Sequence, residues 1–301
     1  MMQGNKKILI CSDCDLDGSG SFWLLTKVFH DYTIESLTTT VKKFRNDITN
    51  WKLLHNIEDY EMIIVCDLDV HVDYEFIDYK NVAIIDHHKS HFENTHVYKN
   101  AGYNVKVYPS CIKLIYDTYK SKLNLTPEEK KLILLIDDYD SYELKTKISL
   151  MLNIVYWSYS GNRLERFLND FKDGFKGFNQ IHHNMISIWK NKFKELIANL
   201  QVFSTTLTID NKQYTCCSTF GDFSINEIAS YIFKKFNCDV VMIINQNNQR
   251  VYVRRSKTCD ADMSKFVMSV CDNEAGGHEA AAGCKLTEQV IELTKTMKKI
   301  Y

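Results

Sequence analysis

The sequence predicts an α/β protein with two domains. An N-terminal domain built around a parallel sheet is joined by a helical linker to a smaller C-terminal α/β domain. In the first half, short continuous apolar runs alternate with helical stretches, which is typical of parallel strands covered on both faces. An amphipathic pattern near residues 181–200 indicates one long helix, and strand and helix patterns begin again after it. We therefore expect domains at residues 1–175 and 202–301, with the helical linker at residues 176–201.

The same patterns place the individual elements in order. Three buried strands are expected in the first half, at Lys7–Cys11, Met62–Cys66 and Val82–Ile85. Three helices are expected around them, at Phe22–His30, Ser110–Lys122 and Thr126–Ile136. The second half predicts strands at Val202–Ile209, Val240–Ile244 and Arg250–Val253, and helices at Ser224–Phe236 and Thr287–Lys299. We also expect the small residues Ala280–Gly283 to open a tightly packed helix.

Composition limits the classes of function. The 301 residues include 37 lysines and arginines against 38 aspartates and glutamates, so the formal net charge is -1. A protein that holds long nucleic acid usually carries a basic excess, so any nucleic-acid contact should be local here. Ten cysteines lie without the regular spacing of a disulfide scaffold, and no apolar run approaches the ~20 residues of a bilayer span. We expect a cytoplasmic protein without membrane contact; a homodimer stays open.

Acidic residues follow each of the three predicted strands of the first half. Asp13, Asp15 and Asp17 follow the first strand, Asp67 ends the second, and Asp86-His87-His88 ends the third. The carboxyl ends of parallel strands meet at one edge of a sheet, so these side chains should converge. Carboxylates that repel one another need cations or protons nearby, and with imidazole they suit manganese, magnesium or zinc. His71, His91 and His96 lack this support, and we expect them at the surface.

A calcium loop is the rival interpretation of the first acidic cluster, because D-x-D-x-D-G opens an EF-hand. That loop needs a glutamate at its twelfth position, which is Leu24 when counted from Asp13. It also follows a helix, whereas this cluster follows a predicted strand. We therefore reject the calcium loop.

The order and spacing of these clusters resemble a known family. Asp15-Leu16-Asp17-Gly18, Asp67, Asp86-His87-His88 and Asp138 resemble the four motifs of DHH phosphoesterases. That family includes RecJ-type exonucleases, nano-RNases, phosphoadenosine-phosphate phosphatases and cyclic-dinucleotide phosphodiesterases. In the second half, Val253–Ser256 and Gly276–Gly283 resemble the DHH-associated substrate domain. The resemblance covers essentially the whole chain.

The resemblance implies a centre with two divalent metal ions, for which we expect manganese, with magnesium as the alternative. Its metal ligands would be Asp15, Asp17, Asp67, His87 and Asp138. Asp67 would bridge the metals, His87 would complete the Asp17 site, and Asp138 would complete the Asp15 site. His88 would face the scissile phosphate, and Asp86 would orient the histidines. Two such metals can clamp the attacking and leaving oxygens and acidify a bridging water.

Two departures from the family pattern matter. Many members carry a histidine where this chain has Cys11; Cys11 and Cys14 form a lone C-x-x-C, which we interpret as two unpaired thiols rather than as a redox or zinc pair. In the fourth motif, Asp137-Asp138-Tyr139-Asp140, the metal ligand is ambiguous, and Asp138 is preferred with Asp137 second.

The second half supplies the expected substrate contacts. These are Arg254, Arg255, Gly276, Gly277 and His278. Glycines let backbone amides approach a ligand, and arginine binds phosphate oxygens in a bidentate manner. Strand alternation puts the two arginines on opposite faces, so only one need act, and Arg255 better matches the family position.

The expected substrate is a short oligonucleotide or linear dinucleotide. The alternatives are a small-nucleotide phosphatase acting on phosphoadenosine phosphate, a cyclic-dinucleotide phosphodiesterase, a RecJ-like single-strand DNA exonuclease, and a catalytically inactive nucleotide sensor. The filled metal positions argue against the sensor.

Overall fold

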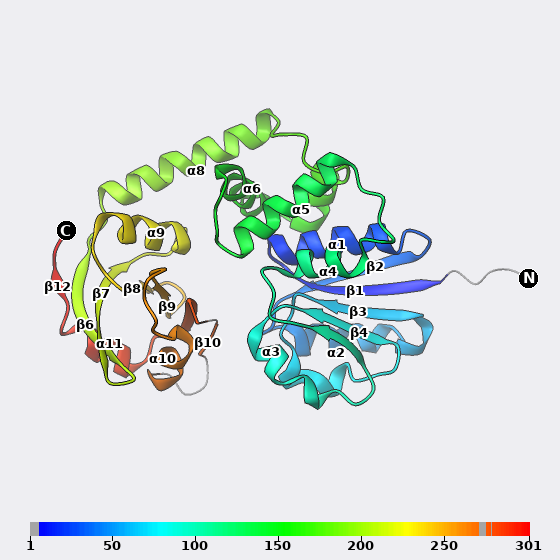
Figure 1. Cartoon of the computed structure of the whole chain (residues 1–301), viewed down its shortest axis with the longest axis horizontal. Coiled ribbons are helices and arrows are strands. Elements are labelled where there is room, and N and C mark those ends of the chain that lie inside the picture. Colours follow the sequence, from blue (N-terminus) through cyan, green and yellow to red (C-terminus); the bar gives the residue numbers. More distant parts are fainter. Residues whose placement is uncertain (1–5, 271–274, 278) are drawn as a thin grey trace, which may run out of the picture. The chain divides into compact units, whose positions relative to one another are not determined.

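The computed structural model describes residues 6–270, 275–277 and 279–301, and it divides into two compact units, Met1–Ile188 and Trp189–Tyr301. The division falls within helix α8 (Gln180–Ala198). Both units combine helices with a sheet (Figure 1). No helix in the described ranges combines the length and the apolar character that crossing a membrane requires.

The first unit is built on a five-stranded sheet in which every pairing is parallel, with the order β2-β1-β3-β4-β5. Its strands are β1 (Lys7–Asp13), β2 (Thr33–Thr39), β3 (Met62–Cys66), β4 (Val82–Asp86) and β5 (Gly102–Val105). The three predicted strands are confirmed as β1, β3 and β4. The sequence pattern missed the two edge strands, because β2 and β5 are only partly buried and lack a continuous apolar run.

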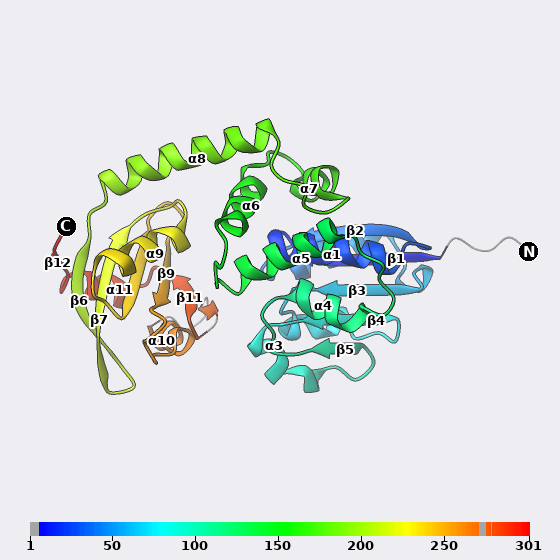
Figure 2. The same ribbon diagram turned by 45° about the horizontal axis from the view of Figure 1, so that its top comes forward.

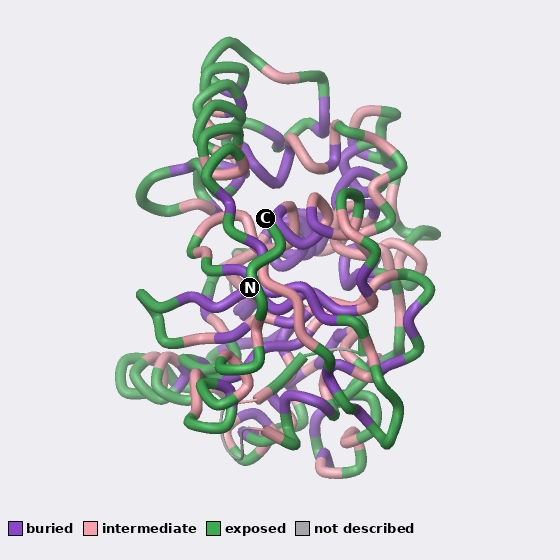
Figure 3. Tube along the Cα trace, turned by 90° about the vertical axis from the view of Figure 1, so that its left-hand side faces the viewer, coloured by how far each residue is buried: buried purple, intermediate pink, exposed green. Residues whose placement is uncertain are grey.

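Helices cover both faces of this sheet (Figure 1). On one face lie α1 (Leu16–Val28), α4 (Cys111–Tyr119) and α5 (Pro127–Asp140); on the other lie α2 (Phe44–Leu54) and α3 (Lys89–Glu93). Short 3-10 helices are η1 (Ile57–Asp59), η2 (His71–Phe76) and η3 (Thr95–Val97), and α6 (Lys147–Ser158) and α7 (Arg163–Phe171) follow α5. The most deeply buried backbone follows the inner strands and the helix faces against them (Figure 3).

Helix α1 begins six residues before the predicted start, and local chemistry explains the difference. The Asp15 carboxylate caps the helix by accepting from the Gly18 amide at 2.9 Å. A Cβ atom on Gly18 would lie 2.3 Å from the Asp13 carbonyl oxygen, so only glycine lets the helix begin this close to the end of β1. The glycines that suggested a turn therefore belong to the first turn of the helix.

The second unit is built on a seven-stranded mixed sheet with the order β10-β11-β9-β8-β7-β6-β12, in which only β7 and β8 pair in parallel among the described strands. Its strands are β6 (Phe203–Ile209), β7 (Lys212–Phe220), β8 (Val240–Asn245), β9 (Arg250–Arg255), β10 (Gly276–Gly277), β11 (Ala281–Lys285) and β12 (Lys298–Lys299). Its helices are α9 (Ile225–Lys235), α10 (Met263–Val270) and α11 (Glu288–Thr294). The unit is an α/β domain, as predicted.

The prediction that Ala280–Gly283 opens a helix is wrong, because this stretch enters strand β11. Ala282 and Cys284 are buried in the apolar core and alternate with Gly283, whose missing side chain allows close contact with Val251 on β9. Small residues are compatible with both elements, and the pairing with β9 decides between them. The last predicted helix is also shorter than expected, since α11 ends at Thr294 and β12 follows.

Candidate metal centre

The acidic strand ends of the first unit meet at one edge of its sheet. Strand β1 lies between β2 and β3, so the strand order reverses direction at β1. In parallel sheets, ligands bind at the carboxyl ends of the strands beside such a reversal. Asp13 ends β1, Asp67 directly follows β3, and Asp86 ends β4. Asp67 and Asp86 are almost completely buried.

Asp67 has an unusual backbone conformation. Its φ angle is +57°, in the left-handed region that residues other than glycine seldom adopt. Its amide nevertheless donates to the Ile85 carbonyl at 3.1 Å, which extends the pairing of β3 with β4 by one residue. Residues held in such conformations are found at functional sites, because the surrounding structure must fix them.

Asp17 lies in the first turn of α1 and is fixed by another helix. Its carboxylate accepts from the amides of Cys111 at 2.6 Å and Ile112 at 3.0 Å, which belong to the first turn of α4. Burial and the neighbouring charge of Asp15 raise the pKa of Asp17 to about 7, although both amides favour the ionised form. The fold therefore holds a carboxylate where ionisation is costly.

His87 lies among three carboxylates. Its Nδ1 is 3.1 Å from the Tyr108 carbonyl oxygen and donates to it, which leaves a lone pair on Nε2 in the neutral ring. The Nε2 atom lies 3.3 Å from Asp67 Oδ1, 3.5 Å from Asp140 Oδ2 and 3.9 Å from Asp17 Oδ2. A lone pair facing carboxylate oxygens is repulsive unless a proton or a metal ion lies between them.

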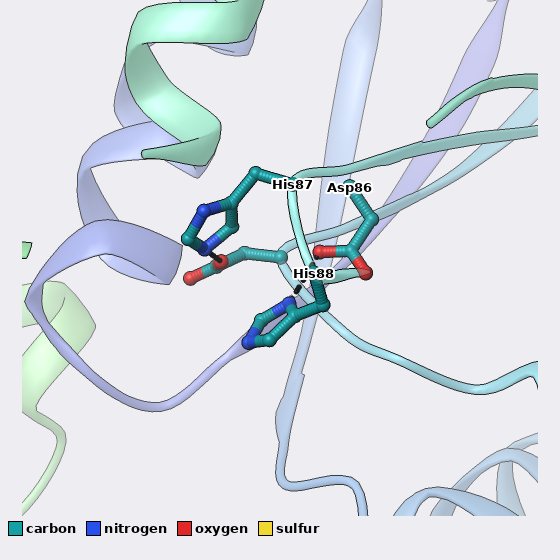
Figure 4. A group of neighbouring side chains, drawn as sticks. Asp86, His87 and His88 are labelled. Atoms are coloured by element: carbon teal, nitrogen blue, oxygen red, sulfur yellow. Dashed lines mark hydrogen bonds and ion pairs between the residues drawn. The ribbon is translucent and has the colours of Figure 1, made fainter. Parts of the chain in front are cut away.

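His88 belongs to a separate hydrogen-bond network, which also contains Asp86 and His91. Figure 4 shows the rings of His87 and His88 turned in different directions after β4, with His88 bonded to Asp86. The Asp86 carboxylate is within 2.8 Å of His88 Nδ1 and 2.7 Å of His91 Nδ1, and His91 Nε2 is 2.7 Å from the Tyr98 hydroxyl. The prediction that His91 lies at the surface is wrong, because its side chain is fully buried in this chain of contacts.

Electrostatics of the two histidines follow from Asp86. Burial opposes ionisation of Asp86, but the charges and hydrogen bonds of His88 and His91 outweigh it and leave the Asp86 pKa far below its ordinary value. Burial lowers the pKa of His88, but the charge and hydrogen bond of Asp86, together with the charges of Asp69 and Asp15, outweigh burial and raise this pKa to about 9. Asp86 therefore orients the His88 ring and carries the opposite charge.

In the fourth acidic motif, the structure brings Asp140 to the centre instead of Asp138. The Asp138 carboxylate accepts from the amides of Lys145 at 2.8 Å and Thr146 at 3.2 Å and from the Ser149 hydroxyl at 2.6 Å. These three donors lie at the start of α6. Asp138 is absent from both potential metal-binding groups found among the described residues, which are Asp67, Asp86, His87 and His88, and Asp17, His87 and Asp140. Asp140, by contrast, forms one of these groups with Asp17 and His87.

The helical spacing of α5 gives a signal for Asp140, but only the packing of the helix decides which face meets the acidic strand ends. Along α5, the buried residues Leu132, Ile133 and Ile136 lie on one face, and Asp140 is four residues after Ile136 on the same face. Asp137, the second choice, is bonded to the Ser110 hydroxyl at 2.7 Å.

The remaining carboxylates complete the centre. Burial raises the pKa of Asp15 and so favours a proton on its carboxyl when no cation is bound, although hydrogen bonding to the Gly18 amide and to Asp67 acts in the opposite direction. Burial and the surrounding carboxylates raise the pKa values of Asp67 and Asp140 well above their ordinary value. Buried carboxylate oxygens and an imidazole nitrogen fit divalent cations such as manganese and magnesium, which would replace these protons.

Cys11 does not join the centre. It lies in β1 within the apolar core beside Leu9 and Val65, and burial raises the pKa of its thiol to about 12. Cys11 and Cys14 are both free thiols, and no potential metal-binding group in the described part of the chain contains a cysteine. The structure thus fits the interpretation of this C-x-x-C as two unpaired thiols.

In the second unit, Arg254 and Arg255 point to opposite faces of β9, as alternation predicts. Arg254 Nε donates to Asn226 on α9 at 2.9 Å, and Arg255 Nη1 donates to the Ala261 carbonyl before α10 at 3.1 Å. Gly277 has a φ angle of +137°, and a Cβ there would lie 2.5 Å from the Ala281 carbonyl oxygen. Gly276 is exposed beside it, and His278 lies outside the described residues.

Comparisons with known proteins agree with this arrangement. The model of the DHH family N-terminal domain matches residues 7–136, and that of the DHHA1 domain matches residues 219–301. A search of curated proteins finds no match.

Among solved structures, the exonuclease RecJ bound to manganese is 12% identical, with a TM-score of 0.57 over 97% of this chain and 88% of that one. A pGpG-specific phosphodiesterase, PggH, from Vibrio cholerae is 13% identical, with a TM-score of 0.57 over 96% of both chains. RecJ of Thermus thermophilus in complex with Mn²⁺ is 11% identical, with a TM-score of 0.57 over 98% of this chain and 51% of that one.

A parallel sheet with an acidic, histidine-bearing centre at its carboxyl edge, followed by a separate mixed-sheet domain, defines a metal-dependent phosphoesterase. With both family domains in their expected order, the chain belongs to the DHH family.

Proposed function

We propose that this protein is a phosphodiesterase that uses two divalent metal ions to hydrolyse short oligonucleotides or linear dinucleotides to mononucleotides. The observation that carries the proposal is the position of His87 Nε2, which lies within 3.9 Å of carboxylate oxygens of Asp17, Asp67 and Asp140. An ion pair that serves only to stabilise the fold would need one carboxylate beside His87. Three carboxylates and an imidazole instead form a set of metal ligands.

The metal ligands that we propose fall into two sets that share Asp67. Asp17, His87 and Asp140 would hold one ion, and Asp15 would hold the other, with Asp67 between them. Asp140 replaces the Asp138 of our first prediction. When bound, manganese or magnesium would activate water and stabilise charge on the phosphate oxygens. Manganese is the first choice, and the RecJ structures bound to manganese support it.

The chain's own residues would orient and hold the substrate. Asp86 fixes the ring of His88 through Nδ1, and we propose that this ring contacts the scissile phosphate. His91 and Tyr98 hold Asp86 in turn, which would limit rotation of the carboxylate. In the second unit, Arg255 or Arg254, with the backbone of Gly276 and Gly277 and with His278, would bind the rest of the nucleotide.

A preference for short substrates follows from charge. Proteins that bind long single strands need a basic groove with aromatic platforms, whereas this chain has a net charge of -1 and the two family domains occupy most of it. The likeness to a pGpG-specific phosphodiesterase supports a dinucleotide, and the likeness to an exonuclease supports the same bond type.

The test is a hydrolysis panel in manganese with four substrates: a linear dinucleotide, a cyclic dinucleotide, phosphoadenosine phosphate and a thirty-nucleotide single strand. We expect the highest kcat/KM for the linear dinucleotide and a shallow salt dependence, because each phosphate contact contributes about -0.7 to the log–log slope. The Asp67→Ala variant, purified in parallel, controls for contaminating nucleases. Faster cleavage of the thirty-mer with a steep salt slope would contradict the proposal.

A further inference from the structure

The end of α6 is attached to the loop that carries the first acidic cluster. The Tyr156 hydroxyl donates to the Cys14 carbonyl at 2.7 Å and lies 2.7 Å from the Ser19 hydroxyl. The Tyr156 side chain is almost fully buried, so this contact is fixed. Figure 2 shows α6 and α7 on the same side of the sheet as α1. This contact attaches the end of α6, where Trp157 follows Tyr156, to the loop from Asp13 to Asp15.

That residue, Trp157, combines an exposed ring with a nearby cation. Its side chain is 48% exposed, although tryptophan is usually buried, and its ring makes an edge contact with Tyr156 at 5.7 Å. The Arg163 guanidinium, at the start of α7, lies 4.5 Å from the centre of the Trp157 ring. No carboxylate within the described ranges forms an ion pair with Arg163.

The rings of Tyr156 and Trp157 connect Arg163 to the acidic loop. Arg163 lies over the Trp157 ring, the Trp157 ring contacts that of Tyr156, and the Tyr156 hydroxyl is bonded to the Cys14 carbonyl. An aromatic ring beside an arginine is the combination with which proteins hold nucleobases and their phosphates.

We propose that Trp157 and Arg163 form a nucleoside-binding subsite beside the Asp13–Asp15 loop, in which the Trp157 ring stacks on one base of a dinucleotide and Arg163 faces its phosphate. This subsite rests on the proposed function, because a nucleotide must first be a substrate. The subsite consists only of residues of the first unit, and it would bind a base rather than the reacting phosphate.

The test compares hydrolysis of the dinucleotide pApA with hydrolysis of analogues in which one adenine, 5′ or 3′, is replaced by hydrogen. For the wild type, we expect one of these analogues to have a KM roughly ten-fold above that of pApA, since base stacking on an aromatic ring contributes at this level. Trp157→Ala should raise the KM for pApA to that of the analogue and leave kcat and manganese content unchanged. The same variant should leave the KM for that analogue unchanged.

Two further variants guard against misfolding and general charge effects. Trp157→Phe keeps a ring and should retain most of the discrimination, and it should lose the quenching of tryptophan fluorescence by adenosine monophosphate. Arg166→Ala removes an exposed arginine of the same helix and should behave as the wild type.

Equal effects of Trp157→Ala on pApA and on both analogues, or an unchanged KM for pApA, would overturn the subsite. A wild-type protein that hydrolyses none of these dinucleotides would instead contradict the proposed function. If Trp157→Ala does not fold, the fluorescence of Trp157→Phe decides: quenching equal to that of the wild type would overturn the subsite.

Discussion

The acidic centre of the first unit and the arginine strand of the second unit hold polar groups in opposite ways. In the centre, Asp17 and Asp67 are at most 3% exposed, and burial and neighbouring carboxylates oppose ionisation of both. On β9, Arg254 and Arg255 are only half-buried. Each donates to an amide or carbonyl oxygen, and Arg255 also forms an ion pair with Glu279 at 3.8 Å. Like charges are concentrated around Asp17 and Asp67, whereas each arginine of β9 has acceptor oxygens of its own.

This difference indicates which region should control metal binding and which should control substrate affinity. Buried carboxylates that repel one another favour the binding of cations, which reduce the repulsion. A substitution of one of these carboxylates should therefore change metal binding and the chemical step. Half-buried arginines that donate to carbonyl or amide oxygens can exchange such an acceptor for a phosphate oxygen, so a substitution there should change substrate affinity and leave the metals in place. Substitutions in each region test this division.

Asp67→Ala should reduce turnover about 1,000-fold or more, because the carboxylate is predicted to bridge both metal ions, whose contribution to catalysis is several kcal/mol. Turnover in saturating manganese, with circular dichroism of the same sample, measures the effect. The fold should be kept, since removing one of several repelling buried carboxylates relieves strain. Wild-type turnover in a folded variant would show that Asp67 is not an essential metal ligand.

Asp140→Asn and Asp138→Asn form a matched pair two residues apart. Asp140→Asn should lower turnover about 100-fold and weaken manganese binding, whereas Asp138→Asn should leave both near the wild-type level. Asp138→Asn should instead lower thermal stability by roughly 3–10 °C, because hydrogen bonds at the start of α6 are weakened by about 1–3 kcal/mol. Elemental analysis and thermal melts separate the two outcomes, and the reversed pattern would restore Asp138 as the ligand.

Arg255→Ala should raise the KM for a dinucleotide about ten-fold, which corresponds to one lost charged hydrogen bond of about 1.5 kcal/mol. Manganese content should stay the same. Arg254→Ala is the control on the opposite face of β9, and its effect on KM should be smaller. A loss of metal in either variant would contradict the assignment of metal binding to the first unit alone. A larger effect of Arg254→Ala on KM would assign the substrate contact to Arg254 instead of Arg255.

Tyr98→Phe should lower kcat by roughly three-fold at unchanged KM, because it removes only the hydrogen bond that supports His91 behind Asp86. The substitution keeps the ring, so thermal stability should change little. Steady-state kinetics with one dinucleotide measure the effect. A change in KM without a change in kcat would show that this chain of contacts does not act through His88.

Much of the centre could be predicted because its signals are local in the chain. Apolar runs that end in Asp13, Asp67 and Asp86 indicate parallel strands, and strand ends of one sheet must share an edge. The D-x-D-G and D-H-H motifs lie directly beside these ends. Their proximity therefore follows from the sequence alone, without any knowledge of how the helices pack.

Only the tertiary structure decided which residues complete the centre. Asp138 and Asp140 are two positions apart in α5 and so point about 200° apart, and the packing of α5 selects which one faces His87. His91 is polar and resembles a surface residue in sequence, but its burial depends on Asp86 and Tyr98, which lie on other elements. Pairing with β9 likewise makes Ala281–Lys285 a strand. Local patterns fix elements and their ends, whereas the partners of a side chain depend on contacts between distant parts of the chain.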